Sequence, residues 1–322
     1  MDFQLVIDNL LQPPILFFAL GMLAVAVRSD LEIPKTLTKL FSLYLLLSIG
    51  FKGGVKLAES GMSMAAVQAV LAGLLISTVI PIYTFFLFRK MVSVPNAAAI
   101  AATYGSISAV TFLTTMTFLI RLEVPFGGYM VAVMALMESP AIILGVILAR
   151  KYGNNQAPDV RKRVLVRESL TNSSVFLLLG SMVIGMLSGS RGWEAMAPFA
   201  GNLFQGMLCL FLLEIGIMSA RQLDEIRKAG LKIVVSALTL SLFNGMLGLL
   251  LAYLIGMPQG DAILFCILAG SASYIAVPAA MRHAIPDANP GLYVSMALAV
   301  TFPLNIAFGI PFYTWLVGVL WG

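Results

Sequence analysis

The chain has 322 residues, of which 60% are hydrophobic and only 11% are charged, and its formal net charge is +5. A soluble domain of ordinary composition carries about 25% charged residues, so this composition excludes a soluble globular protein and indicates an integral membrane protein. Apolar segments of about 20 residues recur along the chain, each long enough to cross the hydrocarbon layer as a helix. Their polarity does not alternate from residue to residue, which excludes the strands of an outer-membrane barrel.

The apolar segments predict ten transmembrane helices and therefore an all-α fold. We expect the helices at residues 13–28, 36–57, 63–89, 95–120, 126–151, 168–189, 196–220, 229–256, 260–283 and 291–320. No lysine or arginine precedes the first segment, so it predicts a retained span and not a cleaved signal peptide. The longest linker, residues 152–167, separates a first five-helix repeat at residues 1–151 from a second at residues 168–322.

Positive charges are distributed unevenly between the two sides of this predicted topology. The side reached by the ends of even-numbered helices holds only Lys52, Lys56, Arg121 and Arg191, and the other 16 of the 20 lysines and arginines lie on the side of the linkers that follow odd-numbered helices. Cytoplasmic loops are enriched in lysine and arginine, so we expect both termini outside and the chain in a bacterial inner (plasma) membrane. The basic excess is then a topology signal and does not indicate nucleic-acid binding.

Three pairs of similar segments indicate that the second half of the chain repeats the first. They are "SIGFKGGVKL" (48–57) with "EIGIMSARQL" (214–223), "GSISAVT" (105–111) with "ASYIAVP" (272–278), and "MALMESP" (134–140) with "MALAVTFP" (296–303). Because each half has five helices, a duplicated half has to insert in the opposite orientation. Inverted repeats with interrupted helices near the membrane midplane are typical of secondary transporters.

Helices four and nine of the prediction each contain a cluster of helix-breaking residues. Gly105 and Gly270 favour a break, and Pro278 removes a backbone donor and frees the carbonyl of Tyr274. A broken helix places a positive N-terminus and a negative C-terminus inside the membrane, where they suit an anion and a cation respectively. Kinked but continuous helices in a tight interface of small residues are the alternative interpretation.

Glu138 lies in the middle of the fifth predicted helix, before Ser139 and Pro140. Ionisable residues at membrane depth are costly and usually functional, so we expect Glu138 to bind the coupling cation or a proton. A structural pairing or a protonated, hydrogen-bonded acid is the alternative. The corresponding segment of helix ten, "TFPLN", offers Thr301 and Asn305 as oxygen ligands.

Other ionisable residues give weaker indications. Glu214 fits an interfacial pair and a functional role equally well. Lys52 and Lys56 fit interfacial anchors whose long stems pack on apolar surface, or an anion-attracting vestibule. His283 is the only histidine, so we expect no transition-metal site, which would need several ligands.

The sequence contains no motif of an intramembrane enzyme. Neither Gly-x-Ser-x-Gly nor His-Glu-x-x-His occurs, and no lysine is expected at membrane depth to pair with a serine. We therefore expect a protein that is not an enzyme and has no organic cofactor. An anion channel is a closer alternative, although paired helix breaks and a single carboxylate favour alternating access.

At these same residues the sequence resembles the sodium-dependent bicarbonate transporters known from cyanobacteria and their bacterial relatives. The most specific segments are "IGFKGG" (49–54), "YGSISAVTF" (104–112), "MESPAIILGVILA" (137–149) and "SASYIAVPAAMRHAIPDANPGLYVSMALAVTFPLNIAFGIPFY" (271–313), and the resemblance covers nearly the whole chain. It implies two inverted five-helix repeats, gate and core domains, and assembly as a homotrimer. It also implies uptake of bicarbonate with co-transported sodium, and regulation by a PII-like protein.

The chain departs from the family pattern at three site positions. Glu138 and Tyr274 stand where the cyanobacterial transporters have aspartate, and Val110 stands where they have serine. The replacements at Tyr274 and Val110 remove an acid and a hydroxyl, and with them one potential cation site.

The predicted substrate site offers backbone and hydroxyl donors but no arginine at membrane depth. Such a site suits a small monovalent anion better than phosphate, sulfate or citrate, because no fixed charge offsets the desolvation of a multiply charged ligand. We expect bicarbonate, or another small monovalent anion or carboxylate, to contact Gly105, Ser106, Ser108, Thr111, Ser271 and Ser273. Sodium is expected beside Glu138, with oxygens from Ser108, Thr301 or Asn305.

Overall fold

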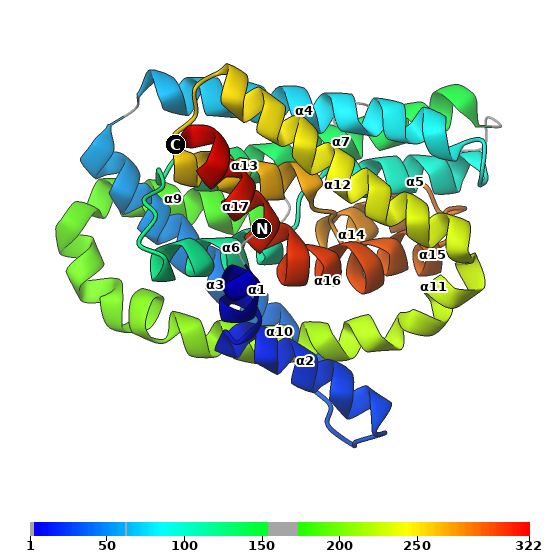
Figure 1. Ribbon diagram of the computed structural model, residues 1–322, viewed down its shortest axis with the longest axis horizontal. Coiled ribbons are helices and arrows are strands. Elements are labelled where there is room, and N and C mark those ends of the chain that lie inside the picture. The colour runs from blue at the N-terminus through cyan, green and yellow to red at the C-terminus, as the bar shows by residue number, and fades with distance from the viewer. Residues whose placement is uncertain (1–2, 62, 154–172) are drawn as a thin grey trace.

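The computed structural model describes residues 3–61, 63–153 and 173–322 (Figure 1). Every regular element in these residues is a helix, so the predicted all-α class is confirmed. The first half contains α1 (Phe3–Leu10), α2 (Pro13–Ala26), α3 (Lys35–Ser60), α4 (Met64–Phe88), α5 (Val94–Gly105), α6 (Ala109–Arg121) and α7 (Met130–Tyr152).

The second half begins within the described residues at α9 (Ser173–Met196). It continues with α10 (Phe204–Arg221), α11 (Leu223–Ala229), α12 (Leu231–Leu254), α13 (Gln259–Gly270) and α14 (Ala276–Ala284). A last helical run, joined by π-helical turns, contains α15 (Pro290–Ser295), α16 (Phe302–Leu304) and α17 (Ile310–Trp321). Residues 154–172, which include most of the predicted linker and the start of the sixth predicted helix, lie outside the described residues.

Seven helical segments of the described chain are long and apolar enough to cross a membrane, or eight when the bent pair α1–α2 counts as one span. The chain is therefore a multi-pass membrane protein. Two features make this number smaller than ten. Ser173–Ala229 is one run of 57 residues, about 85 Å of helix at 1.5 Å per residue, and Figure 1 shows it turning back between α9 and α10. The ninth predicted helix is divided into α13 and α14, of 12 and 9 residues, each too short to cross alone.

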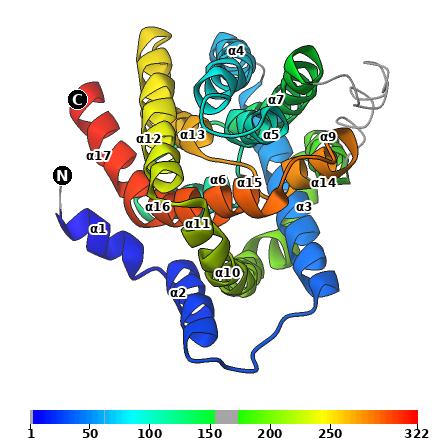
Figure 2. The same cartoon turned by 90° about the vertical axis from the view of Figure 1, so that its right-hand side faces the viewer.

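The helices form two groups that lie side by side (Figure 2). One group, which we call the panel, consists of α2, α3, α9 and α10, with α2 packed on α10 and α3 packed on α9. The other group, which we call the bundle, consists of α4, α5, α7, α12 and α13. Helices α6 and α14 and the first part of the last helical run lie between the two groups.

Glycines bring the panel helices into backbone contact. A Cβ on Gly54 would lie 1.9 Å from the Met182 carbonyl oxygen, and one on Gly185 would lie 2.2 Å from that of Phe51. The second pair meets in the same way, since a Cβ on Gly216 of α10 would lie 2.1 Å from a backbone oxygen of α2. Only residues without a side chain permit this spacing, which is how small residues promote helix packing in lipid.

Helices α5 and α13 form the centre of the bundle. α5 is buried from Ala97 to Gly105 and α13 from Gly260 to Gly270. The alanines of α5 let its neighbours approach closely, since a Cβ on Gly145 of α7 would lie 2.8 Å from the Ala102 side chain. The two central helices therefore end inside the protein. The backbone N–H and C=O groups that are left unpaired at these helix ends have to find hydrogen-bond partners there.

Candidate functional site

The two helix breaks lie against each other between the panel and the bundle. One break separates α5 from α6, and the other separates α13 from α14. The Ser108 amide donates to the Ser271 Oγ at 2.9 Å, and the Ser273 amide donates to the Thr103 carbonyl at 2.9 Å. Each break thus satisfies backbone groups of the other, which makes irregular backbone tolerable inside a membrane protein.

The residues at the breaks explain where each half-helix ends and begins. The backbone conformation of Gly105 is not left-handed. Glycine is required at this position by close packing, because a Cβ there would lie 2.1 Å from the Pro81 side chain of α4. Ser108 caps α6, since its Oγ accepts a hydrogen bond from the Thr111 amide at 3.2 Å. Pro278 lies in the first turn of α14, where an N–H would have no helical partner, so it favours a helix start and not a kink.

Side chains from the last helical run hold the two central helices. The Gly270 carbonyl at the C-terminus of α13 accepts hydrogen bonds from the Ser241 hydroxyl at 2.6 Å and the Asn305 amide nitrogen at 3.0 Å. The Thr301 hydroxyl is 2.7 Å from the Tyr104 hydroxyl of α5, within hydrogen-bond distance. The two residues expected as cation ligands from helix ten therefore both take part in hydrogen bonds to α13 and α5.

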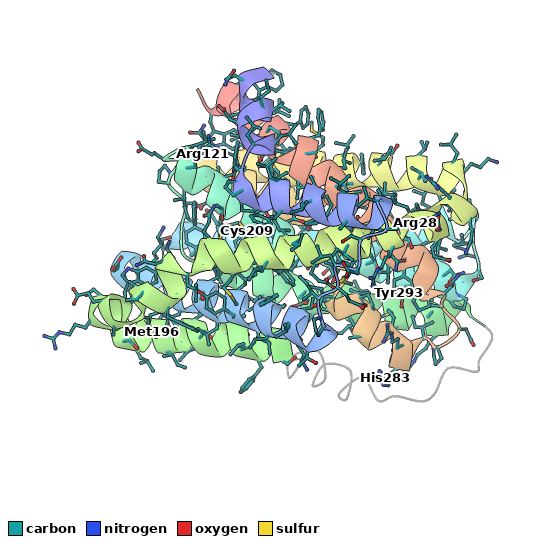
Figure 3. All side chains as sticks on the ribbon, turned by 90° about the horizontal axis from the view of Figure 1, so that it is seen from below. Arg28, Arg121, Met196, Cys209, His283 and Tyr293 are labelled. Atoms are coloured by element: carbon teal, nitrogen blue, oxygen red, sulfur yellow. The ribbon has the colours of Figure 1, made fainter. Side chains whose placement is uncertain are left out.

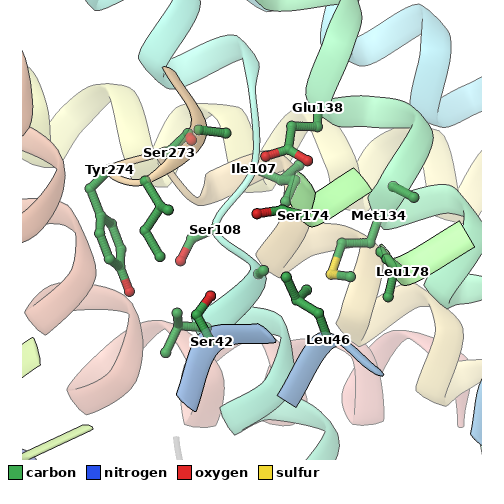
Figure 4. Close-up of a pocket in the computed structure, with 15 residues that line it drawn as sticks. Ser42, Leu46, Ile107, Ser108, Met134, Glu138, Ser174, Leu178, Ser273 and Tyr274 are labelled. Atoms are coloured by element: carbon green, nitrogen blue, oxygen red, sulfur yellow. The ribbon is translucent and has the colours of Figure 1, made fainter. Parts of the chain in front are cut away.

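The N-terminal ends of α6 and α14 border a cavity of about 30 Å³ (Figure 4). Amides in the first turn of a helix have no partner within the helix and carry the positive end of its dipole. Both half-helices therefore present positive backbone ends to one small space. The cavity is lined by Ser42, Leu46, Ile107, Ser108, Ala109, Val110, Met134, Ala135, Glu138, Ser174, Leu178, Ser273, Tyr274, Ile275 and Ala276.

Glu138 supplies the carboxylate of this cavity. The residue is half-buried on α7, and Figure 4 shows its carboxylate directed into the cavity, on the side to which Ser174 also points. Its backbone carbonyl accepts a hydrogen bond from the Ser106 hydroxyl at 3.3 Å. Among the described residues, no basic side chain forms a salt bridge with Glu138. A negative group without a cationic protein partner thus lies beside two positive helix ends.

The hydroxyl of Ser108 is arranged as a donor toward the cavity. Its oxygen accepts hydrogen bonds from the Thr111 amide at 3.2 Å and the Thr111 hydroxyl at 2.8 Å, which occupies both lone pairs of a hydroxyl oxygen. Only the Ser108 proton remains for a bound group. The oxygen of Ser273 also accepts a bond, from the Val277 amide at 3.4 Å. This side of the cavity therefore suits an anion.

The structure brings some of the predicted site residues to the cavity and not others. Of the six expected substrate residues, Ser108 and Ser273 line the cavity. The other four support the breaks without lining it: Gly105, Ser106, Thr111 and Ser271. Of the expected cation residues, Glu138 and Ser108 line the cavity, whereas Thr301 and Asn305 do not.

Three polar cavity residues are missing from the predicted site. Ser42 of α3 and Ser174 of α9 come from the panel, and Tyr274 comes from the break before α14. Tyr274 stands within the cluster of helix breakers, which is a signal that sequence reasoning could have used. Single serines in apolar helices carry no such signal, because their hydroxyls can equally bond to their own helix.

A vestibule of about 770 Å³ adjoins the cavity and shares Ser42, Ser174, Tyr274, Ile275 and Ala276 with it. The charged residues that line this vestibule are Glu32, Lys39, Glu214, Arg221 and Arg282. It lies at the end of the protein where Figure 3 shows Arg28 and His283. The cavity therefore adjoins a vestibule whose basic lining residues are Lys39, Arg221 and Arg282.

A second vestibule, of about 480 Å³, lies between the panel and α6. It is lined by Lys52 and Arg121 and, among the described residues, by no acidic side chain. It shares no lining residue with the small cavity, and Figure 3 places Arg121 at the end opposite Arg28 and His283. The second vestibule thus has no described lining residue in common with the cavity, and its charged lining residues are basic. Lys56 lies outside it, with its ammonium group over the ring of Phe126.

A match to a known protein family covers most of the chain. Residues 13–318 match the model of the Na⁺-dependent bicarbonate transporter superfamily. The matched region includes both helix breaks, Glu138 and the whole wall of the cavity. No protein of curated function matches the chain.

Proposed function

The chain belongs to the Na⁺-dependent bicarbonate transporter superfamily, and from this premise we propose that it is a secondary active transporter for sodium-coupled uptake of bicarbonate. The observation that carries the proposal is the cavity between the breaks. Two positive half-helix ends and the Ser108 donor face one side of it, and the Glu138 carboxylate faces it from α7. One small space thus offers complementary surroundings for an anion and a cation.

Sodium and the anion support each other in this arrangement. A sodium ion beside Glu138 neutralises a carboxylate that would otherwise repel a bound anion. The anion in turn adds a negative partner for the sodium ion. The coupling is reciprocal by thermodynamic linkage, so each ligand raises the affinity for the other by the same factor. Oxygens from Thr301 or Asn305 remain the proposed additional ligands of sodium, whereas the Ser108 hydroxyl oxygen already accepts two hydrogen bonds.

The packing of the panel supports the proposal of two inverted five-helix repeats, at residues 1–151 and 168–322. The first helix of one repeat, α2, packs on the second helix of the other, α10, while α3 packs on α9. A two-fold axis between repeats produces this reciprocal pairing. The same offset of 167 residues separates the starts of α4 and α12, at Met64 and Leu231, and those of α6 and α14, at Ala109 and Ala276.

Transport by this fold requires that the cavity opens to one side at a time. The cavity is connected to the vestibule of about 770 Å³ and separated from that of about 480 Å³. By the charge asymmetry of the linkers, the larger vestibule faces the cytoplasm and both termini face outside. Motion of the panel against the bundle would close the larger vestibule and connect the cavity to the smaller one. The separation of the two vestibules also argues against a continuous anion channel.

The family resemblance supports two further proposals about partners. One is assembly as a homotrimer in the inner membrane. The other is regulation by a PII-like protein on the cytoplasmic side, where the linker 152–167 is expected. Most of that linker lies outside the described residues.

Uptake of radiolabelled bicarbonate into proteoliposomes tests the proposed function. We expect uptake that requires an inward sodium gradient and stops when potassium replaces sodium. Formate and acetate are tested in parallel, because a small carboxylate fits the same donors. Sodium-dependent uptake of formate or acetate without bicarbonate uptake would change the assigned substrate. It would still support a sodium-coupled transporter. Steady current without coupled uptake would contradict a transporter.

A further inference from the structure

The hydroxyl of Tyr274 is buried without a hydrogen-bond partner. The residue is only 6% exposed, and among the described residues no group completes a hydrogen bond with its oxygen, although Ser108 lies close to it. Other buried tyrosines differ, since Tyr313 donates to the Leu242 carbonyl and Tyr129 donates to the Asp261 carboxylate. Buried hydroxyls in proteins nearly always have a partner, so an unpartnered one at a cavity wall calls for a ligand.

The position of Tyr274 connects it with both spaces of the proposed transport path. It lines the small cavity and also the vestibule of about 770 Å³. Figure 4 shows its hydroxyl on the same side of the cavity as Ser42 and Ser108. The ring is held in place by an edge contact with Phe302, at 5.5 Å between ring centroids. A ligand that enters from the vestibule therefore meets a hydroxyl that is already oriented.

The groups around Tyr274 offer hydrogen-bond donors and few acceptors. The oxygen of Ser108 already accepts two hydrogen bonds, so its hydroxyl can only donate to a ligand. The first-turn amides of α6 and α14 also have donor character, although those of Thr111 and Val277 already donate to Ser108 and Ser273. A cation needs several oxygen lone pairs, of which this side of the cavity offers few. A ligand with several acceptor oxygens fits instead.

We propose that Tyr274 is a specificity-determining residue whose phenol donates a hydrogen bond to one oxygen of the transported anion while Ser108 donates to another. This inference rests on the proposed function and names the substrate class of the same site as planar monovalent oxyanions, such as bicarbonate and formate. Two separate donors require two acceptor atoms, which a halide lacks. None of the described residues that line the cavity is basic, which disfavours multiply charged oxyanions.

Thermal unfolding of the purified full-length protein in detergent tests this proposal without transport. The probes are sodium bicarbonate, sodium formate and sodium chloride at equal sodium concentration and ionic strength. We expect bicarbonate or formate to raise the melting temperature of the wild type relative to chloride. In Tyr274→Phe that oxyanion-specific shift should be lost, while the melting temperature in chloride stays unchanged because no protein partner is removed.

Tyr313→Phe is the matched control, because it removes a buried phenol that is bonded to a backbone carbonyl away from the cavity. It should lower the melting temperature in chloride and keep the oxyanion-specific shift. In proteoliposomes that transport bicarbonate, Tyr274→Phe should raise the KM for bicarbonate about tenfold, the effect of one lost hydrogen bond to a charged ligand. Half-saturating sodium at saturating bicarbonate should stay unchanged.

Three results would overturn the proposal: a wild-type shift that chloride matches or that no anion produces, an undiminished shift in Tyr274→Phe, or a lower melting temperature of that variant in chloride. The last result would mean that the hydroxyl has a structural partner. The proposed function can fail separately. A wild type that shows the oxyanion-specific shift but takes up neither bicarbonate nor formate would keep the role of Tyr274 in anion recognition and reject transport of these anions.

Discussion

Glu138 is the residue on which the electrostatics of the cavity depend. Its carboxylate points into a space where two positive helix ends converge, and none of the described basic side chains forms a salt bridge with it. A charge in a largely apolar cavity is costly without a partner, and a bound sodium ion would be that partner. At 4 Å and an effective dielectric constant of 20, such a pair is worth about 4 kcal/mol.

We therefore expect Glu138→Gln to weaken sodium binding by at least about 100-fold, because the amide keeps the shape of the side chain and removes its charge. Sodium-driven uptake into proteoliposomes should fall to background, while the amount of folded protein in the membrane stays unchanged. Glu123→Gln is the control, since Glu123 is an exposed residue of the loop between α6 and α7. Wild-type uptake with unchanged sodium dependence would assign Glu138 to structure.

At the scale of elements, the panel is held together by backbone contact between α3 and α9. Gly50 and Gly54 of "IGFKGG" lie on this contact, whereas Gly53 faces Val131 of α7. Gly54 is the tightest position, because its Cβ would lie 1.9 Å from the Met182 carbonyl oxygen. The motif that supported the family resemblance thus has a packing role. Close helix pairs of this kind move as rigid units, which suits a panel that shifts against the bundle.

Gly54→Ala should lower the melting temperature of the purified protein, because the added methyl forces α3 away from α9 and costs about 1–3 kcal/mol. Gly180→Ala is the matched control on the facing helix α9, because a Cβ at that position would have no atom within 4 Å. That variant should be neutral or slightly stabilising, since alanine is the better helix former. Equal melting temperatures for the two variants would contradict the close contact.

For the whole molecule, the decisive property is the orientation of the two halves in the membrane. The panel pairing fits inverted repeats, and each inverted five-helix repeat has its ends on opposite sides. The linker 152–167 and the C-terminus should therefore face opposite sides of the membrane. The two native cysteines, Cys209 and Cys266, are both buried, which favours labelling of introduced cysteines.

We expect a membrane-impermeant maleimide to label Gly322→Cys in intact cells, and to label Gln156→Cys only after the membrane is permeabilised. A variant without Cys209 and Cys266 provides the background. Labelling of both positions from the same side of the membrane would contradict the inverted repeats. Labelling of Gln156→Cys in intact cells, with Gly322→Cys labelled only after permeabilisation, would contradict the charge-based orientation.

Much of this architecture follows from the sequence because a bilayer restricts the possible structures. Apolar length indicates the membrane class, since only helices and closed barrels satisfy their backbone there. The positions of both helix breaks follow from local chemistry, because Gly105, Ser108, Pro278 and their neighbours favour helix ends over helix interiors. The importance of Glu138 follows from the cost of placing an acid in an apolar segment.

Other features depend on contacts that no local pattern contains. Thr301 and Asn305 are plausible ligands by type, but their hydrogen bonds to Tyr104 and Gly270 depend on how the last helical run crosses the bundle. The short half-helices and the turn between α9 and α10 also change how many segments qualify as spans.

The sequence by itself determined the class of the protein, its helical segments, the two breaks and the buried acid, because hydropathy and helix-breaking chemistry act within a few residues along the chain. Only the tertiary structure decided which of these residues share a cavity. Ser42 and Ser174 come from the panel, and Tyr274 comes from the break between α13 and α14. These residues meet Ser108 and Glu138 only through packing between distant helices. The donor-only character of Ser108 is in contrast local, since both hydrogen bonds that its oxygen accepts come from Thr111, three residues along the chain.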